Sequence, residues 1–138
     1  MMYVDSNVFI YPVIYDDRVV KEAKAAKAIL LRIAEGELEA STASVTWDEL
    51  VWVVRRTLGA GVAAREGRKF LEFPNLNVLS VDEKAVAEAQ RITEKYRLKP
   101  RDAIHIGCAV ENKIDKIMSD DPDFDVVKEV SRIRLGAV

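Results

Sequence analysis

Short apolar and β-branched runs alternate along this chain with longer amphipathic stretches whose apolar residues recur at helical spacing. Such alternation is typical of βα units, in which each strand joins a parallel sheet and the following helix packs on one of its faces. The pattern therefore predicts an α/β protein: a three-layer α/β/α sandwich around a central, mainly parallel sheet of five strands.

The element boundaries follow from the same pattern and from the glycines and prolines between the runs. The five strands are expected at residues 2–4, 38–41, 77–79, 116–118 and 133–135. Long helices are expected at residues 19–34, 46–58, 63–73, 82–96 and 100–111, with a short helical piece near 124–127. The first strand leads into a helical turn from Asn7 to about Tyr11, because Pro12 removes a backbone donor and ends it.

Length and composition narrow the class of protein. A chain of 138 residues with 49% hydrophobic residues fits one domain over residues 1–138. Its apolar runs fall short of the roughly 20 residues that a spanning helix needs, and its start lacks the basic leader of a signal peptide. The single cysteine, Cys108, cannot form an internal disulfide, so the cytoplasm is the expected compartment. Cys108 is most simply a small core residue. A net charge of −2 gives no general argument for a nucleic-acid partner.

Four short acidic motifs fall where a strand or loop gives way to a helix. They are Asp5 in Val-Asp-Ser-Asn, Glu49 in Thr-Trp-Asp-Glu-Leu, Asp102 in Pro-Arg-Asp-Ala, and the cluster Asp120, Asp121 and Asp123. Open parallel sheets bind ligands beyond the carboxyl ends of their strands. Because Asp5 and the last cluster directly follow strands, we expect them on the same rim of the sheet.

Each motif also has a local explanation that needs no function. Thr46 and Glu49 fit a capping box at a helix start, Asp121 and Asp5 fit helix caps, and Asp102 suits the positive end of its helix. Capping does not require that several acids converge, however. Converging carboxylates repel one another, so they must take up protons or bind a cation. Oxygen ligands without His or Cys suit Mg²⁺ or Mn²⁺ rather than Zn²⁺.

The ordered motifs resemble those of the PIN-domain ribonucleases, and chain length and helix order look most like the VapC-type toxins of prokaryotic toxin–antitoxin pairs. The resemblance assigns the four acidic positions to Asp5, Glu49, Asp102 and Asp121, with Asp123 as an accessory acid, and implies that these five residues hold the metal. The fourth motif usually reads Thr-x-Asp-x-Asp-Phe. Here Ser119 replaces the threonine and Asp120 adds an acid, so Asp120 remains an alternative to Asp121.

What the resemblance implies is an endoribonuclease dependent on Mg²⁺ or Mn²⁺, which would form a homodimer and bind a cognate antitoxin across its active-site groove. Ser6 or Ser119 would supply a small hydroxyl that supports the site or touches substrate. Arg101 and Arg56 lie next to the acidic motifs in the sequence and are candidates for contacts with RNA phosphates.

Two further features, His105 and the helix at residues 46–58, admit more than one interpretation. His105 follows Asp102 by one helical turn and is more often structural in such a place, with a proton donor at the rim as the alternative. Residues 46–58 leave hardly any polar face, so this helix is expected either to form a dimer or antitoxin surface anchored by Trp52 or to be fully buried. Trp47 is expected in the core.

Two other functions compete with the nuclease. A phosphatase of the haloacid dehalogenase type also places an Asp after the first strand, but it needs a second Asp two residues later, where this chain has Asn7. A non-catalytic PIN-like module that binds RNA or protein is the other alternative. A degenerate member of that kind is expected to have lost at least one of the four acids, and all four are filled here.

Overall fold

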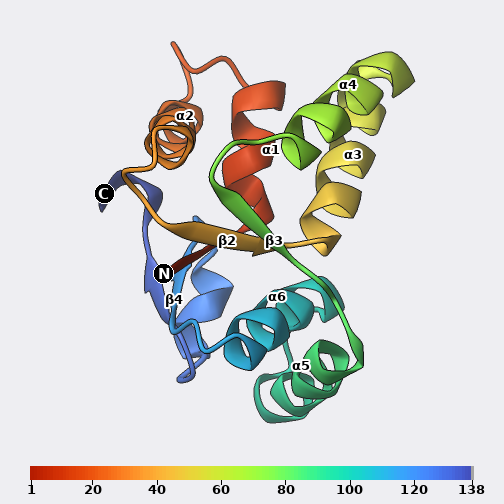
Figure 1. The fold of residues 1–138 in the computed structure, drawn as a ribbon, viewed down its shortest axis with the longest axis vertical. Helices are drawn as coiled ribbons and strands as arrows, with labels where there is room; N and C mark the ends of the chain where they lie inside the picture. Colours follow the sequence, from red (N-terminus) through yellow and green to blue (C-terminus); the bar gives the residue numbers. More distant parts are fainter. Residues whose placement is uncertain (138) are drawn as a thin grey trace.

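The structure is a computed structural model that describes residues 1–137. Within this range, five short strands form one sheet with a layer of helices on each face (Figure 1). The strands are β1 (Met2–Val4), β2 (Ala40–Ala43), β3 (Leu76–Leu79), β4 (Lys116–Met118) and β5 (Ser131–Ile133). The helices are α1 (Ser6–Ile14), α2 (Lys21–Ala34), α3 (Val45–Leu58), α4 (Ala60–Leu71), α5 (Glu83–Tyr96) and α6 (Pro100–Glu111), with 3-10 helices η1 (Pro122–Val126) and η2 (Leu135–Ala137). The predicted α/β/α sandwich is confirmed.

The strands run in the order β3-β2-β1-β4-β5, and the four pairings between neighbours in residues 1–137 are parallel. β1 lies at the centre, where Tyr3 is paired with Ser41 of β2 on one side and with Ile117 of β4 on the other. The chain leaves β1 toward β2 and later returns to β4, so the strand order reverses between β1 and β4. Ligands bind open parallel sheets at such a reversal, beyond the carboxyl ends of the strands.

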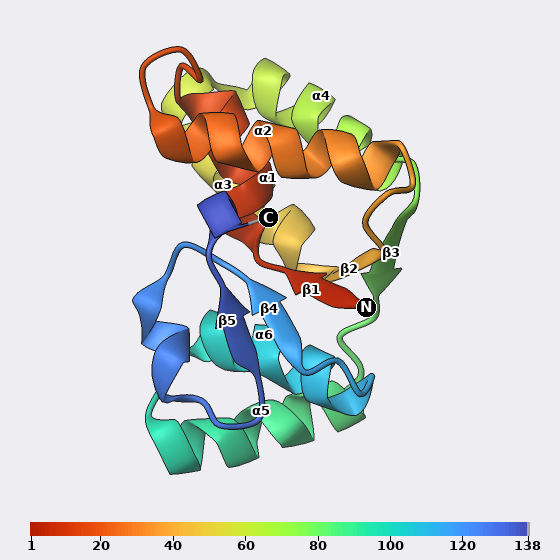
Figure 2. The same ribbon diagram turned by 90° about the vertical axis from the view of Figure 1, so that its left-hand side faces the viewer.

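Different helices cover the two faces of the sheet (Figures 1 and 2). Helices α1 to α4 pack on one face, and α5, α6 and η1 pack on the other. Because side chains alternate along a strand, Val4 of β1 joins the apolar core of the first face and Tyr3 joins that of the second. The central strand is therefore buried on both sides, and this packing fixes the position of Asp5, the residue that follows it.

Helix α1 is longer than its proline suggests. It runs past Pro12 to Ile14, and the N–H of Tyr15 still donates to the carbonyl of Tyr11 at 3.0 Å. The prediction that the helix ends at Pro12 is therefore wrong. Pro12 removes one backbone donor, but Val8–Ile10 are buried and α1 packs against both α2 and α3. Packing of this apolar face outweighs the local propensity.

The remaining boundary differences have a common cause. β2 begins at Ala40 instead of residue 38, because it pairs residue by residue with β3 from Leu76 onward. β5 ends at Ile133, and Leu135, expected in the strand, turns into η2 and is buried beside α2. α4 begins at Ala60 instead of residue 63. Strand pairing and packing against distant elements fix the ends of β2 and β5, and neither is visible in a local pattern.

Helix α3 exposes part of its apolar surface. Only Thr46, Leu50 and Val54 are buried on it, whereas Trp47 and Trp52 are 42% and 50% exposed. The expectation that Trp47 lies in the core is therefore wrong, and so is the interpretation of residues 46–58 as a fully buried helix. The indole of Trp47 lies over α4 at Gly67, and its outer side remains open. None of the helices in residues 1–137 is long and apolar enough to cross a membrane.

Helix α6 packs unusually close to α5. A Cβ added at Gly107 would lie 2.5 Å from the carbonyl oxygen of Ala85 and 2.8 Å from the backbone nitrogen of Ala89. Only glycine allows the two backbones to approach this closely. Cys108, the next residue, is a buried free cysteine, as predicted. This contact fixes the position of the helix that carries Asp102 and His105.

Candidate active site

Asp5 lies at the reversal of strand order, directly after β1. It caps α1, because its Oδ1 accepts a hydrogen bond from the backbone N–H of Ser6 at 2.8 Å. Its Oδ2 accepts one from the hydroxyl of Ser119 at 2.6 Å, and its N–H donates to the carbonyl of Met118 at 3.0 Å. These bonds join the carboxyl ends of β1 and β4, and they leave Asp5 only 5% exposed.

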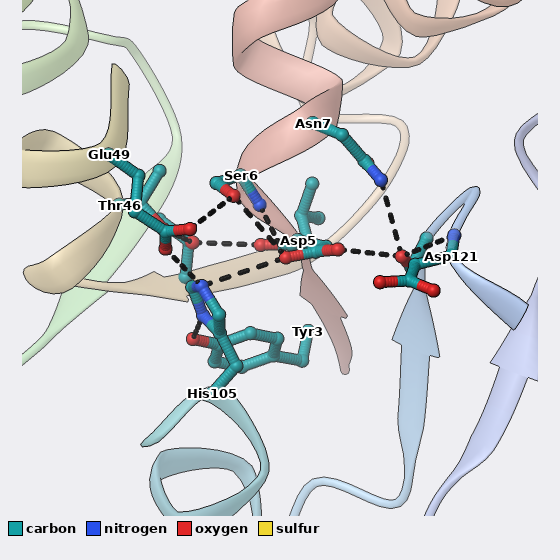
Figure 3. A network of polar contacts seen from close by, with 11 residues as sticks. Tyr3, Asp5, Ser6, Asn7, Thr46, Glu49, His105 and Asp121 are labelled. Carbon is teal, nitrogen blue, oxygen red and sulfur yellow. Dashed lines mark hydrogen bonds and ion pairs between the residues drawn. The ribbon is translucent and has the colours of Figure 1, made fainter. Parts of the chain in front are cut away.

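Glu49 comes to the same place from the second turn of α3. The predicted capping box is wrong: Ser44 precedes the helix without a side-chain cap bond, and the Thr46 hydroxyl instead shares a hydrogen bond of 2.8 Å with the hydroxyl of Thr42 in β2. The Glu49 carboxylate is therefore free of a capping role. Its Oε2 accepts a hydrogen bond from the hydroxyl of Ser6 at 3.2 Å, so the first and second acidic motifs are in contact (Figure 3).

His105 lies behind these two acids and is fully buried. Its Nε2 is 2.5 Å from Oε1 of Glu49 and 3.6 Å from Oδ1 of Asp5, and its Nδ1 is 2.6 Å from the hydroxyl of Tyr3 (Figure 3). The ring has no exposed surface and reaches the site through Glu49 and Asp5. Its spacing of three residues from Asp102, which puts both side chains on one helix face, was the signal for its place among the acids.

Three acids gather on the opposite side of the site. Asp102, Asp121 and Asp123 each offer one oxygen, and these oxygens lie within 4.8 Å of one another. Asp121 caps η1 by accepting from the N–H of Asp123 at 2.9 Å, and its own N–H donates to Ser119 at 3.0 Å. Asp120 points elsewhere and accepts from the hydroxyl of Tyr11 at 3.3 Å. Geometry therefore favours Asp121 over Asp120 as the acid of the fourth motif.

Crowding of negative charge changes the acidity of the site. Burial raises the pKa of Asp5 above its ordinary value, and the neighbouring charge of His105 opposes this effect. Burial, together with the charges of Asp5 and Asp121, raises the pKa of Asp102 to about 6. Burial works against protonation of His105, but the hydrogen bond to Glu49 and the charge of Asp5 outweigh it, so the pKa of His105 is raised. A cation beside the acids would relieve this repulsion.

The donor set fits a hard divalent cation. The three acids that gather closely offer oxygen alone, as Mg²⁺ and Mn²⁺ prefer. A further acceptor lies beside them: among buried side-chain polar atoms of residues 1–137, Oδ1 of Asn7 lacks a hydrogen-bond partner. Its Nδ2 donates at 3.4 Å to Ser119, the same hydroxyl that serves Asp5. A hydrated cation would supply the donors that this unpaired oxygen requires.

The predicted substrate-contact residues fall into two groups. Ser6 and Ser119 are buried and bonded to the site carboxylates, so they support the acids directly. The two arginines are exposed: Arg101 pairs with Asp48 at 3.2 Å, and the guanidinium of Arg56 lies 4.3 Å from the centre of the Trp52 ring. Neither arginine contacts the acids within the part of the chain that the structure describes.

The acids that the sequence motifs singled out are thus brought together around the end of the central strand. The family model described as "PIN domain" matches residues 2–130 of the sequence. The chain belongs to the PIN-domain family. The predicted family is therefore confirmed, and with it the expectation of a PIN-like fold. Among curated proteins, no sequence matches.

Solved structures of other PIN proteins have the same fold. VapBC2 from Rickettsia felis, bound to a fragment of promoter DNA, matches with a TM-score of 0.73 at 13% identity over 97% of this chain and 98% of that one. VapC20 of Mycobacterium tuberculosis, described as a toxin that cleaves the sarcin-ricin loop, matches with a TM-score of 0.73 at 14% identity, over 93% of this chain and 95% of that one. FitAcB from Neisseria gonorrhoeae matches with a TM-score of 0.70 at 18% identity, over 100% of both chains. At these identities the likeness shows the fold.

Proposed function

We propose that this protein is an endoribonuclease that depends on Mg²⁺ or Mn²⁺ and hydrolyses RNA phosphodiester bonds. The observation that carries the proposal is the convergence of Asp5, Glu49, Asp102 and Asp121 beyond the carboxyl ends of β1 and β4, four acids that come from distant parts of the sequence. Membership of the PIN-domain family supports a nuclease in general. Residues 1–138 would act as one nuclease domain.

The two sides of the site would have different tasks. Asp102, Asp121 and Asp123 would hold the cation from one side. Asp5 and Glu49 would contribute further oxygen ligands from β1 and α3, directly or through water. A bound Mg²⁺ or Mn²⁺ ion lowers the pKa of a coordinated water and neutralises charge on the phosphoryl group under attack. The chain supplies the placement: hydrogen bonds from buried groups fix the inner acids, and Asp102, with its pKa near 6, is ionised at neutral pH.

We also propose that the protein is the toxin of a toxin–antitoxin pair, acts in the cytoplasm and forms a homodimer. The similar VapBC and FitAcB structures support an antitoxin as partner. The half-exposed Trp52 on α3 supports a protein interface on that helix, because exposed aromatic residues often anchor interfaces. The alternative of a non-catalytic binding module predicts the same surface without hydrolysis.

Cleavage of RNA by the purified, antitoxin-free protein tests the proposal. A panel of labelled single-stranded and hairpin RNAs is incubated with Mg²⁺ or Mn²⁺, with EDTA, and with the variant Asp5→Asn. We expect cleavage that EDTA abolishes, that added Mn²⁺ restores and that the variant lacks. Cleavage that persists in EDTA, or that is equal in the variant, would contradict the metal mechanism. Binding of RNA without any cleavage would favour the non-catalytic module.

A further inference from the structure

We propose that Tyr3 and His105 form a buried relay of hydrogen bonds that orients the carboxylate of Glu49, which makes His105 a positioning residue of the site. The proposal rests on the proposed function for what the site does. Its geometry and part of its test are independent of RNA cleavage.

The relay crosses the core from the central strand to α3. Tyr3 of β1 and His105 of α6 are both 0% exposed, and their rings meet edge to face with centroids 5.6 Å apart. The Tyr3 hydroxyl is 2.6 Å from Nδ1, and Nε2 is 2.5 Å from Oε1 of Glu49 (Figure 3). Both nitrogens of the ring are thereby engaged, each with a different element of the fold.

The partners determine which way the hydrogens point. A carboxylate only accepts hydrogen bonds, so the ring must carry its hydrogen on Nε2 to bond Glu49. In a neutral ring, Nδ1 then has a lone pair that accepts the hydrogen of the Tyr3 hydroxyl. In the charged ring, which the raised pKa of His105 favours, both nitrogens carry hydrogens and Nδ1 donates to the Tyr3 oxygen. The other neutral form would set a lone pair of Nε2 against the carboxylate. In both the charged form and the first neutral form, Tyr3 bonds Nδ1 while Nε2 donates to Glu49, so Tyr3 holds the ring in the orientation that serves Glu49.

Glu49 depends on this bond more than Asp5 depends on any one of its bonds. Asp5 has a short side chain held by a backbone N–H and a hydroxyl, whereas Glu49 has a longer side chain on the surface of α3. Apart from His105, its hydrogen-bond partner among the described residues is the Ser6 hydroxyl at 3.2 Å. Each oxygen of the Glu49 carboxylate accepts one of these two hydrogen bonds, and each keeps a further lone pair that could bind a cation. Carboxylates that bind metals are often held by such outer hydrogen bonds.

Packing alone gives no reason for a histidine at this position. Ile106 and Ala109 fill the core around it without polar atoms, and burying an imidazole costs free energy unless its nitrogens are bonded. The bonds to Tyr3 and Glu49 offset that cost. They also connect the centre of the sheet to an acid that a third element supplies.

The relay can be tested with a double-mutant cycle on Mn²⁺ binding. Tyr3→Phe, which keeps the ring, and His105→Gln are each made in the parent and in Glu49→Ala, and Mn²⁺ dissociation constants are measured by calorimetry after circular dichroism has verified folding. Loss of a group that holds a metal ligand costs about 10- to 100-fold in metal affinity, so we expect roughly tenfold weaker binding in each variant. In Glu49→Ala we expect no further loss, since His105 acts through Glu49.

Tyr96→Phe is the matched control. It removes a comparable bond, from the Tyr96 hydroxyl to Oε1 of Glu129 at 2.5 Å, between α5 and the segment before β5. We expect its Mn²⁺ affinity to equal that of the parent. If Tyr3→Phe and His105→Gln weaken binding equally with and without Glu49, their role is in the core and the relay is overturned. If the cycle is non-additive but the parent cuts no RNA, the relay stands and the nuclease proposal fails.

Discussion

The two halves of the acidic site differ in how completely the protein itself fixes them. Asp5 and Glu49, the inner half, are held by hydrogen bonds from buried hydroxyls, a backbone N–H and an imidazole. In the outer half, one oxygen each of Asp102, Asp121 and Asp123 lies within 4.8 Å of the others. Asp121 is held by hydrogen bonds with Asp123 and Ser119, whereas burial and acidic neighbours raise the pKa of Asp102. The inner half is therefore organised in advance, whereas under the proposed mechanism a bound cation would balance the outer half.

Replacing an acid of the outer half should have the largest effect. We expect Asp102→Asn to lower RNA cleavage by roughly 100-fold or more, because loss of groups that merely support a metal ligand already costs about 10- to 100-fold. The control is Asp125→Asn, which changes an exposed carboxylate of η1 that pairs with Arg132 at 2.7 Å. Cleavage rates at saturating Mn²⁺ measure both. Equal cleavage rates for Asp102→Asn and Asp125→Asn would show that Asp102 has no part in catalysis.

The free energy of unfolding, measured with and without metal, should also distinguish the outer half of the site from the inner half. We expect Mn²⁺ to raise the free energy of unfolding of the parent by about 2.7 kcal/mol at a free concentration of 100 times its Kd. Without metal, Asp102→Asn should be more stable than the parent, because it removes one of the repelling carboxylates. Thermal unfolding with EDTA and with Mn²⁺ checks both statements. A parent protein that is indifferent to Mn²⁺ would mean that these carboxylates need no cation.

The pH dependence follows from the raised pKa of Asp102, about 6. At subsaturating Mn²⁺, we expect activity to fall as the pH drops through 6, by about tenfold per unit for loss of one ligand to one proton. Stability of the metal-free protein should change in the opposite direction. The folded pKa lies above the unfolded value, so the stabilising contribution of this carboxyl is complete below the unfolded value and is lost as the pH rises through 6. Unfolding of the parent and Asp102→Asn at pH 5 and 7 should show a larger gap at pH 7.

The smallest effect on stability is expected for Arg101, which lies outside the acidic site in an exposed ion pair with Asp48. Arg101→Ala breaks a pair whose two side chains are 52% and 54% exposed, so the unfolding midpoint should hardly move. If Arg101 meets RNA phosphates, binding of uncleaved RNA by the Asp5→Asn protein should weaken, and the slope of log affinity against log salt should fall by about one. An unchanged slope would assign Arg101 to the surface pair alone.

Most of the fold could be predicted from the sequence because the relevant signals are local. The β-branched runs and helical spacings gave α6 and β4 with their observed ends, and the position of Asp5 and Asp121 after strands placed both on one rim. The predictions that failed depend on distant partners. Pro12 is kept in α1 by packing, the Thr46 hydroxyl turns to Thr42 instead of capping its helix, and Trp47 stays at the surface over α4.

In the site, too, local motifs could be predicted from the sequence and contacts between distant residues could not. A motif reveals which acids occur, but not which side chain lies behind them. His105 looked structural because its partners, Tyr3 and Glu49, are 102 and 56 residues away in the sequence. Likewise the choice between Asp120 and Asp121 needed the contact of Asp120 with Tyr11, which joins α1 to the loop after β4.

The contact of α5 with α6 at Gly107 bears on how this protein tolerates sequence change. Most core positions can exchange one apolar side chain for another, since neighbouring side chains adjust. Position 107 has no such freedom, because the atoms that an added Cβ would meet at 2.5 and 2.8 Å belong to the α5 backbone. A single added methyl would have to separate two helices, and α6 would carry Asp102 and His105 away together. A substitution at this one buried glycine would therefore be expected to disrupt the proposed site while every acid stays in the sequence.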